Sequence, residues 1–338
     1  MDEDQEPPFR VWALLGARAG DNDQVLALAE ALGLPFEIKQ LRYNGLRRLG
    51  PRLLGKSLAS LETDSRRLIT REAPPDITIS VGHRSVPIVR MLRAISRGRT
   101  RSIHIGFPRV SPGEFDLVIA TPQYPNPDHP NLLRVPFALT HFATQGRQEH
   151  PHDLATLPRP RRLLIVGGPT SYWRLDEGAL RQRVHSLVDD ARRGGSLMVT
   201  TSPRTPLGLR TEIAKCLEAT GVKFALAAPG QQPTYAEMLA AADVILVTAD
   251  SVAMVSDAIW TGKPVGILPL VPSMAGRTVG RVLDLLRPGS PRYPRDLRYF
   301  WRGLANLGLG EQPSLPNHSP DEWKARIVNR ARSVIERR

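Results

Sequence analysis

Cysteine and long apolar runs are both scarce in this 338-residue sequence. The single cysteine, Cys216, excludes an intramolecular disulfide and a multi-cysteine metal site. The most apolar segments, such as 163–166 and 244–248, are far shorter than the roughly 20 residues that a membrane-spanning helix needs. The acidic first residues lack the basic start and the apolar run of a secretory signal. We therefore expect a cytoplasmic protein.

Several motifs with known chemistry are also missing. The glycine-containing loops match neither the P-loop pattern nor the dinucleotide fingerprint, which disfavours an ordinary NTPase or dehydrogenase. No HExxH or GxSxG occurs and the eight histidines are scattered, so we expect no metal site and no hydrolase nucleophile. Aromatic residues make up only 6% of the chain and no nucleic-acid-binding module is present. We expect no nucleic-acid partner.

Positive charge is in excess, with 46 Lys and Arg against 33 Asp and Glu. A net charge of +13 favours an anionic partner. The alternative is an ordinary solvated surface, because many bacterial proteins from arginine-rich proteomes carry such an excess. Residues 41–61 mix five basic residues with frequent leucines, which is typical of a segment that lies on an anionic membrane surface. The alternative is a pair of short helices whose leucines pack inward.

Short apolar runs alternate with helical periodicity along the whole chain, which predicts parallel sheets covered by helices. Prolines and charges at 150–162 indicate a linker. We therefore predict two doubly wound α/β domains. The expected boundaries are 9–149 for an N-terminal domain, 163–318 for a C-terminal domain, and 319–338 for a helix that returns to the first domain.

Polar loops follow three successive strands predicted in the second half. In an open α/β sheet, ligands bind beyond the carboxyl ends of the strands, and glycine allows a close backbone approach. Hydroxyl and guanidinium groups in these loops suit a diphosphate. The nucleotide-binding candidates are Gly167, Gly168, Thr201, Ser202, Arg204, Asp250, Ser251 and Asp257.

Ser251 and Asp257 each have two interpretations. Ser251 either shares the helix N-terminal N–H groups with a phosphate or is only an N-cap. Asp257, six positions on, either accepts hydrogen bonds from a ribose or is a solvated helix residue. The sequence leaves both pairs open.

The N-terminal domain offers polar loops after two of its predicted strands. Asp21 ends a small-residue loop and is the candidate catalytic base, with helix capping as the alternative. We expect the helix itself to begin near Asp23. His83 closes a second strand end and is either a functional or a structural histidine. The acceptor-side candidates are Arg18, Gly20, His83 and Arg84.

Four segments together resemble a known family. They are RAGDNDQ at 18–24, IVGGPT at 165–170, TTSPRTP at 200–206 and TADSVAMVSDAIWTGKPV at 248–265. On these, the chain is identified as a bacterial member of the mitochondrial fission Elm-one family. The same segments are similar to GT-B glycosyltransferases of the lipid-linked peptidoglycan type, with Asp257 where those enzymes carry a ribose-binding glutamate. The loop that ends in Asp21 departs from the histidine expected there.

The resemblance implies a GT-B-like fold, with two Rossmann-like domains facing a central cleft. It also implies a nucleotide-sugar-dependent glycosyltransferase without metal or cofactor, whose donor is a nucleotide-sugar such as a UDP-linked one. The acceptor expected is an envelope or lipid-linked molecule, at the inner membrane. The alternative is a non-catalytic GT-B-shaped scaffold in membrane, envelope or division complexes.

Overall fold

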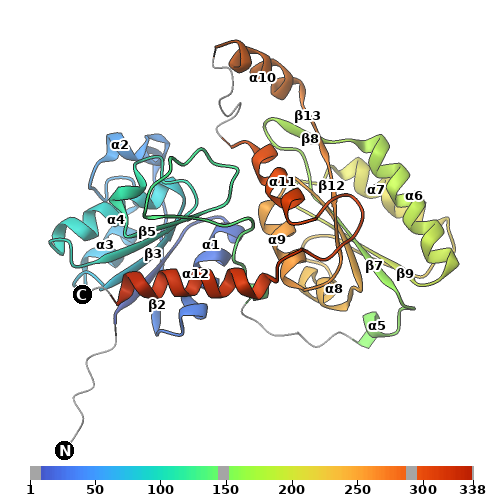
Figure 1. The fold of residues 1–338 in the computed structure, drawn as a ribbon, viewed down its shortest axis with the longest axis horizontal. Coiled ribbons are helices and arrows are strands. Elements are labelled where there is room, and N and C mark those ends of the chain that lie inside the picture. The colour runs from blue at the N-terminus through green and yellow to red at the C-terminus, as the bar shows by residue number, and fades with distance from the viewer. Residues whose placement is uncertain (1–8, 144–151, 287–294, 337–338) are drawn as a thin grey trace, which may run out of the picture. The chain divides into compact units, whose positions relative to one another are not determined.

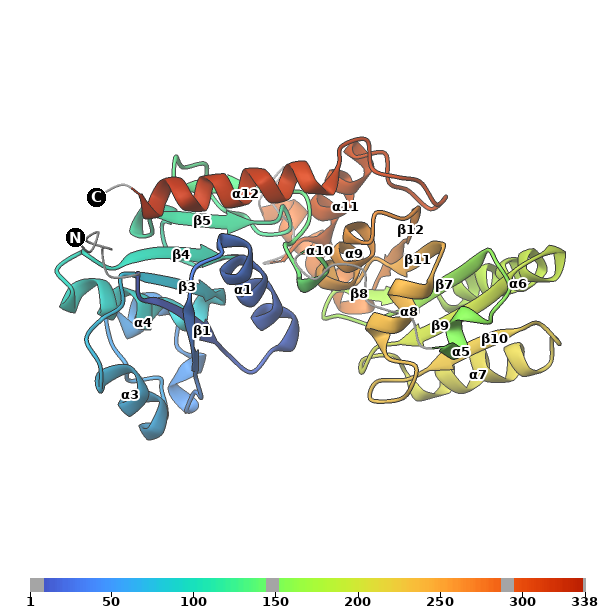
Figure 2. The ribbon, with the colours of Figure 1, turned by 90° about the horizontal axis from the view of Figure 1, so that it is seen from below.

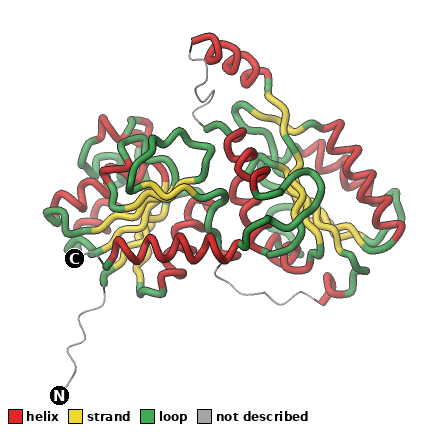
Figure 3. Tube along the Cα trace, in the orientation of Figure 1, coloured by secondary structure: helices red, strands yellow, loops and turns green. Residues whose placement is uncertain are grey.

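The chain folds into two compact units in the computed structural model, which describes residues 9–143, 152–286 and 295–336 (Figure 1). The first unit combines residues 1–144 with 321–338, and the second contains residues 145–320. We refer to them as the first and second domains. In each, strands form a central layer with helices on both sides (Figure 3).

The first domain is built on a six-stranded parallel sheet in the order β2-β1-β3-β4-β5-β6. All five residues of β1 are buried, as expected for a strand covered on both faces. The strands are β1 (Val11–Leu15), β2 (Phe36–Gln40), β3 (Ile77–Val81), β4 (Arg101–Ile105), β5 (Leu117–Ala120) and β6 (Leu132–Arg134). The helices are α1 (Ala19–Leu32), α2 (Pro51–Leu54), α3 (Thr63–Thr70), α4 (Gly82–Ile95) and α12 (Pro320–Ile335).

The last helix, α12, belongs to the first domain (Figure 2). Its apolar face, which includes Ile327 and Ala331, is buried. Arg332 donates to the carbonyl oxygen of Leu32 at the end of α1 (3.3 Å). Arg330 donates to the carbonyl oxygen of Pro130 (2.7 Å). The two ends of the sequence thus contribute to one domain.

The second domain has a five-stranded parallel sheet in the order β10-β9-β7-β11-β12, which matches the first five strands of the doubly wound Rossmann order 3-2-1-4-5-6. A two-stranded sheet pairs β8 with β13. The strands are β7 (Arg161–Val166), β8 (Trp173–Leu175), β9 (Ser196–Thr201), β10 (Phe224–Ala227), β11 (Val244–Thr248), β12 (Val265–Leu268) and β13 (Leu270–Pro272). The helices are α5 (His152–Ala155), α6 (Glu177–Arg193), α7 (Leu207–Glu218), α8 (Tyr235–Ala241), α9 (Val252–Trp260), α10 (Met274–Leu286) and α11 (Leu297–Asn306).

The observed boundaries differ from those expected in three places. Helix α1 begins at Ala19 rather than near Asp23, and α4 at Gly82, so Gly20, Asp21 and His83 lie in first helical turns instead of loops. Strand β7 begins at Arg161, and α5 lies within the segment expected to be a linker. The first two residues of that segment, 150 and 151, are outside the described residues.

The predicted fold class, α/β with two doubly wound Rossmann-like domains, is confirmed for each domain by itself. The facing of the two domains across a central cleft stays a prediction. Within the described parts of the chain, no helix combines the length and the apolar character that crossing a bilayer requires.

Candidate functional site

The carboxyl edge of the second sheet has its topological switch point between β7 and β11. Sequence order reverses there, because β7 is followed outward by β9 on one side and by β11 on the other. Ligands of open α/β sheets bind in the crevice at such a point. The loops that begin at Gly167 and Ala249 leave the sheet at this position.

A single buried carboxylate, that of Asp250, connects the loops after β7, β9 and β11. Its Oδ2 accepts hydrogen bonds from the backbone N–H of Gly168 (3.1 Å) and from the Arg204 guanidinium (2.6 Å). Its Oδ1 accepts from the hydroxyl of Thr248 (2.7 Å), whose oxygen accepts from the N–H of Gly167 (2.7 Å). The side chain of Asp250 is fully buried, whereas 44% of the Arg204 side chain is exposed. The structure therefore brings these predicted residues together.

Both positions after β7 require glycine because neighbouring atoms lie too close for a side chain, and not because the backbone has a positive φ. A Cβ built on Gly167 would overlap with the carboxylate of Asp250. A Cβ on Gly168 would overlap with the backbone carbonyl of Arg204. The N–H of Gly168 donates to Asp250, and the nucleotide-binding role of Gly168 stays a prediction.

The loop after β9 is held by Thr205, one of the hydroxyl residues of the loops that were predicted to suit a diphosphate. Its hydroxyl donates to the carbonyl oxygens of Val166 (2.8 Å) and Gly167 (2.7 Å) and accepts from the N–H of Ser202 (2.9 Å). The hydroxyl of Ser202 accepts from the N–H of Arg204 (3.2 Å). At the end of β9, the buried hydroxyl of Thr201 has no hydrogen-bond partner among the described residues. A buried polar atom without a partner is costly unless a ligand or water satisfies it.

The structure of helix α9 decides only in part between the alternative roles of Ser251 and Asp257. Ser251 is an N-cap, since its Oγ accepts from the N–H of Met254 (3.4 Å). Asp257 is buried, with 9% exposed, and accepts from the Tyr235 hydroxyl (3.0 Å), so it is not a solvated helix residue. Lys263 donates to the carbonyl oxygen of Leu239 (2.7 Å), near the C-terminal end of α8, where a cation is favourable.

In the first domain, the strand order places the switch point between β1 and β3. The loop after β1 is closed by Asn22, which the sequence analysis missed. Its amide accepts from the N–H of Gly16 (2.8 Å) and donates to the Gly16 carbonyl (2.9 Å). Asp21, the predicted base, lies in the first turn of α1, with its carboxylate 4.0 Å from the guanidinium of Arg18. The N-cap position of α1 is Arg18, so Asp21 does not cap the helix.

Positive groups gather at the same edge. His83 and Arg84 stand in the first turn of α4, and Arg109 follows β4 with a left-handed backbone (φ 60°). Burial, which has the largest effect, and the charges of Arg109, Arg84 and Arg18 together lower the pKa of His83 to about 4. The predicted acceptor-side residues thus lie within electrostatic reach of one another, together with Arg109.

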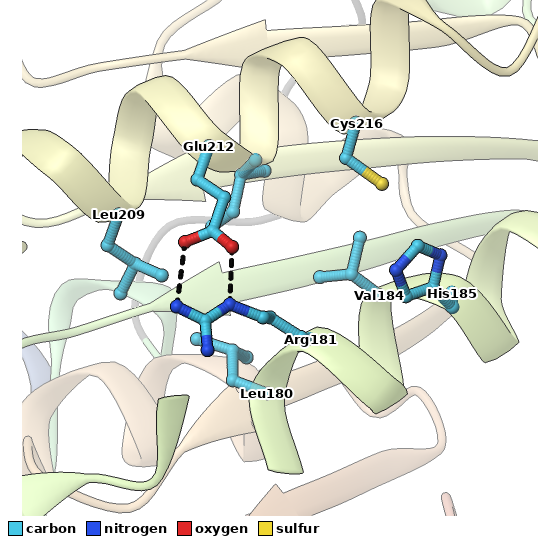
Figure 4. A pocket seen from close by; sticks show the side chains of 8 residues that line it. Leu180, Arg181, Val184, His185, Leu209, Glu212 and Cys216 are labelled. Carbon is cyan, nitrogen blue, oxygen red and sulfur yellow. Dashed lines mark hydrogen bonds and ion pairs between the residues drawn. The ribbon is translucent and has the colours of Figure 1, made fainter. Parts of the chain in front are cut away.

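A shallow groove between α6 and α7 is separate from both edges (Figure 4). It is lined by four apolar side chains and by Cys216 and His185, and Arg181 pairs with Glu212 across it. The two charged side chains of the groove are thus paired with each other.

In the described ranges, no group of three or more His, Cys, Asp and Glu residues could hold a metal ion.

A comparison with protein-family models shows which family the chain belongs to. The family model described as "Mitochondrial fission ELM1" matches residues 19–289, which is most of the sequence. The chain belongs to this family. The ELM1 relative from Arabidopsis thaliana, "Mitochondrial fission protein ELM1", is 28% identical over 221 residues, or 57% of this chain. The chain spans about half of that protein's length (51%). The predicted family membership is confirmed.

Solved structures similar to this ELM1-family chain extend over nearly all of it at low identity. MurG from Acinetobacter baumannii is 13% identical, with a TM-score of 0.48 over 97% of this chain and 92% of that chain. The ADP-heptose LPS heptosyltransferase II of E. coli is 13% identical, with a TM-score of 0.44 over 96% and 98%. The UDP-GlcNAc 2-epimerase of Methanocaldococcus jannaschii is 10% identical, with a TM-score of 0.48 over 97% and 93%. The doubly wound α/β fold of each domain follows from the strand orders of the chain's own two parallel sheets.

Proposed function

We propose that this ELM1-family protein is a cytoplasmic glycosyltransferase that transfers a sugar from a nucleotide-sugar to an envelope or lipid-linked acceptor. The observation that carries the proposal is the convergence of Gly168, Arg204 and Asp250 at the switch point of the second sheet. Three loops meet there at the position where α/β sheets bind ligands. Helix N-termini and cations supply positive potential without a metal.

The donor would lie along the loop after β9 and the N-terminal part of α9. Arg204 keeps part of its guanidinium exposed and can pair with a diphosphate while it holds Asp250. The unpartnered hydroxyl of Thr201 is a further hydrogen-bonding group at this strand end. The buried carboxylate of Asp257 supplies a fixed acceptor for ribose hydroxyls, next to the hydroxyl of Tyr235.

In the transfer, an acceptor hydroxyl oxygen would form a bond to the anomeric carbon of the sugar. The bond from that carbon to the diphosphate oxygen would break, and the nucleoside diphosphate would leave with the electron pair. The hydroxyl proton would pass to a base. Asp21, whose carboxylate is 42% exposed at the carboxyl edge of the first sheet, is the candidate for that role.

Isothermal titration with UDP and other nucleoside diphosphates tests the donor site. Asp257→Ala removes the ribose acceptor, and a hydrogen bond to a charged group contributes about 1.5–3 kcal/mol, so a loss of affinity of roughly 10-fold or more is expected. Arg204→Ala removes the guanidinium that is proposed to pair with the diphosphate, so it should also weaken binding. Its matched control is Arg192→Ala, because Arg192 is an exposed residue at the C-terminal end of α6 with an ion pair to Asp189. No binding to the wild type, or equal binding to Asp257→Ala, refutes the proposal.

A second function, a non-catalytic scaffold at an anionic membrane surface, is favoured by the exposed side chains of residues 41–61. In the 41–61 segment, some leucines are buried, but others are exposed beside exposed basic residues. The exposed leucines are Leu46, Leu49 and Leu53, and the exposed basic residues are Arg42, Arg47, Arg48, Arg52 and Lys56.

Flotation with vesicles that contain phosphatidylglycerol tests this scaffold function. Leu53→Glu places a charge on a side chain that is 80% exposed, and we expect it to weaken vesicle binding. The matched control is Leu207→Glu, at a leucine of the second domain that is 76% exposed. Equal flotation of both variants and the wild type contradicts a membrane role for residues 41–61.

A further inference from the structure

Three arginines and one histidine in the first domain come from the ends of three adjacent parallel strands. Arg18 follows β1, His83 and Arg84 follow β3, and Arg109 follows β4. Because these strands are parallel and paired in register, their carboxyl ends lie at one edge of the sheet. The positions of the strands, rather than any one loop, bring the four side chains together.

The cluster is electrostatically unfavourable as it stands. The N–H groups at the start of a helix carry a partial positive charge, so first-turn cations are disfavoured. Arg84 nevertheless occupies the first turn of α4, beside His83, and that turn has no acidic residue and no side-chain cap. Every charge that shifts the pKa of His83 is that of an arginine, and each lowers it. An anionic ligand would relieve this repulsion.

Four further features suit an anionic ligand at this edge. The Nε atom of Arg84 is buried and has no hydrogen-bond partner among the described residues. Helix α1 starts at the same edge, and its N-cap residue, Arg18, makes no side-chain cap hydrogen bond. Asn22 fixes the loop in front of α1 through its two hydrogen bonds with Gly16. Arg109 has a left-handed backbone, a conformation that is uncommon for residues other than glycine.

We propose that Arg18, His83, Arg84 and Arg109 form a binding site for a phosphate or diphosphate ester at the carboxyl edge of the first sheet. Arginine pairs with phosphate oxygens through two parallel hydrogen bonds, and helix N-termini add N–H donors. In the transferase proposed above, this site would select a phosphorylated acceptor. As a binding site, it does not depend on the nucleotide site of the second domain.

The titration of His83, followed by NMR with and without inorganic pyrophosphate, tests the site. A bound anion replaces repulsion by attraction, so the midpoint should rise by about one pH unit or more. In Arg18→Ala/Arg109→Ala, the ligand-free pKa of His83 should already be higher, and pyrophosphate affinity should fall at least about 10-fold. The control is Arg67→Ala, whose side chain is 78% exposed on α3.

Pyrophosphate could also bind the second domain, and the His83 signal separates the two. Asp257→Ala should leave the His83 shift intact, even if nucleotide binding is lost or was never present. An unchanged His83 midpoint at saturating pyrophosphate overturns the proposal, as does equal affinity in the double variant. Vesicles with phosphatidic acid, compared with free pyrophosphate, distinguish a lipid-borne phosphate from a soluble one.

Discussion

Replacing Gly167 with alanine should destabilise the second domain by a mechanism that the structure specifies. The added methyl group would overlap with the carboxylate of Asp250. The backbone of Gly167 is not left-handed, so alanine is not disfavoured by its own conformation. Asp250 would have to move, and it would lose its bonds to Gly168, Thr248 and Arg204.

The size of the effect follows from the burial of Asp250. A buried charge that loses its partners costs about 3–5 kcal/mol, and the exposure of Arg204 places the loss toward the lower part of that range. For a domain of this size, 1 kcal/mol corresponds to about 2–4 °C in Tm, so a loss of about 3 kcal/mol should lower the transition by roughly 6–12 °C. Thermal denaturation followed by circular dichroism measures it.

Two further variants make this prediction specific. Gly208→Ala in α7 meets no atom within 4 Å and should be neutral or stabilise the domain by up to about 1 kcal/mol. In an Asp250→Ala background, the overlap no longer exists, so Gly167→Ala should cost little in a double-mutant cycle. If Gly167→Ala lowers the stability equally in both backgrounds, or leaves the Tm of the wild type unchanged, the overlap is not the cause.

Three other predictions address the same structure. Asp250→Asn keeps the shape but loses the ion pair and one acceptor, and we expect a loss of about 1–3 kcal/mol in urea denaturation; wild-type stability would contradict the network. The pKa values of His83 and His104 in the folded protein are lowered to about 4 and about 3. The unfolded state therefore binds more protons than the folded state below pH 6.5. The free energy of unfolding should be full above that pH and should fall as the pH drops toward 4. His83→Gln should flatten this dependence in denaturation curves between pH 7 and 4, and an unchanged slope would be evidence against it. Ile327→Ala should cost about 2–5 kcal/mol because the side chain is 1% exposed, and hydrogen exchange should rise in the first domain while the second keeps its protection.

The sheets were predictable from sequence because buried parallel strands are continuously apolar. The most apolar segments, 163–166 and 244–248, lie within β7 and β11. The helix starts were less predictable. The N-cap residues of α1 and α4 are Arg18 and Val81, neither of which is a preferred cap, so no capping signal marks either start.

The site residues were found by their place at strand ends, but their partners were not. Asp250 and Arg204 are 46 positions apart, and their ion pair arises only when β9 and β11 lie in one sheet. The hydrogen bond between Tyr235 and Asp257 likewise arises only when the separate helices α8 and α9 come together in the folded domain. Asn22 was missed although its signal is local, since an amide six residues after Gly16 can close the intervening loop by bonding both backbone groups of that glycine.

The position of α12 has a consequence for how the molecule is made. Translation delivers the sheet of the first domain early, but the helix that covers part of it only after every residue of the second domain. A nascent chain would therefore leave the surface that Ile327 and Ala331 later occupy open to water or to a chaperone for most of synthesis. The second domain, contiguous in sequence, can finish folding first.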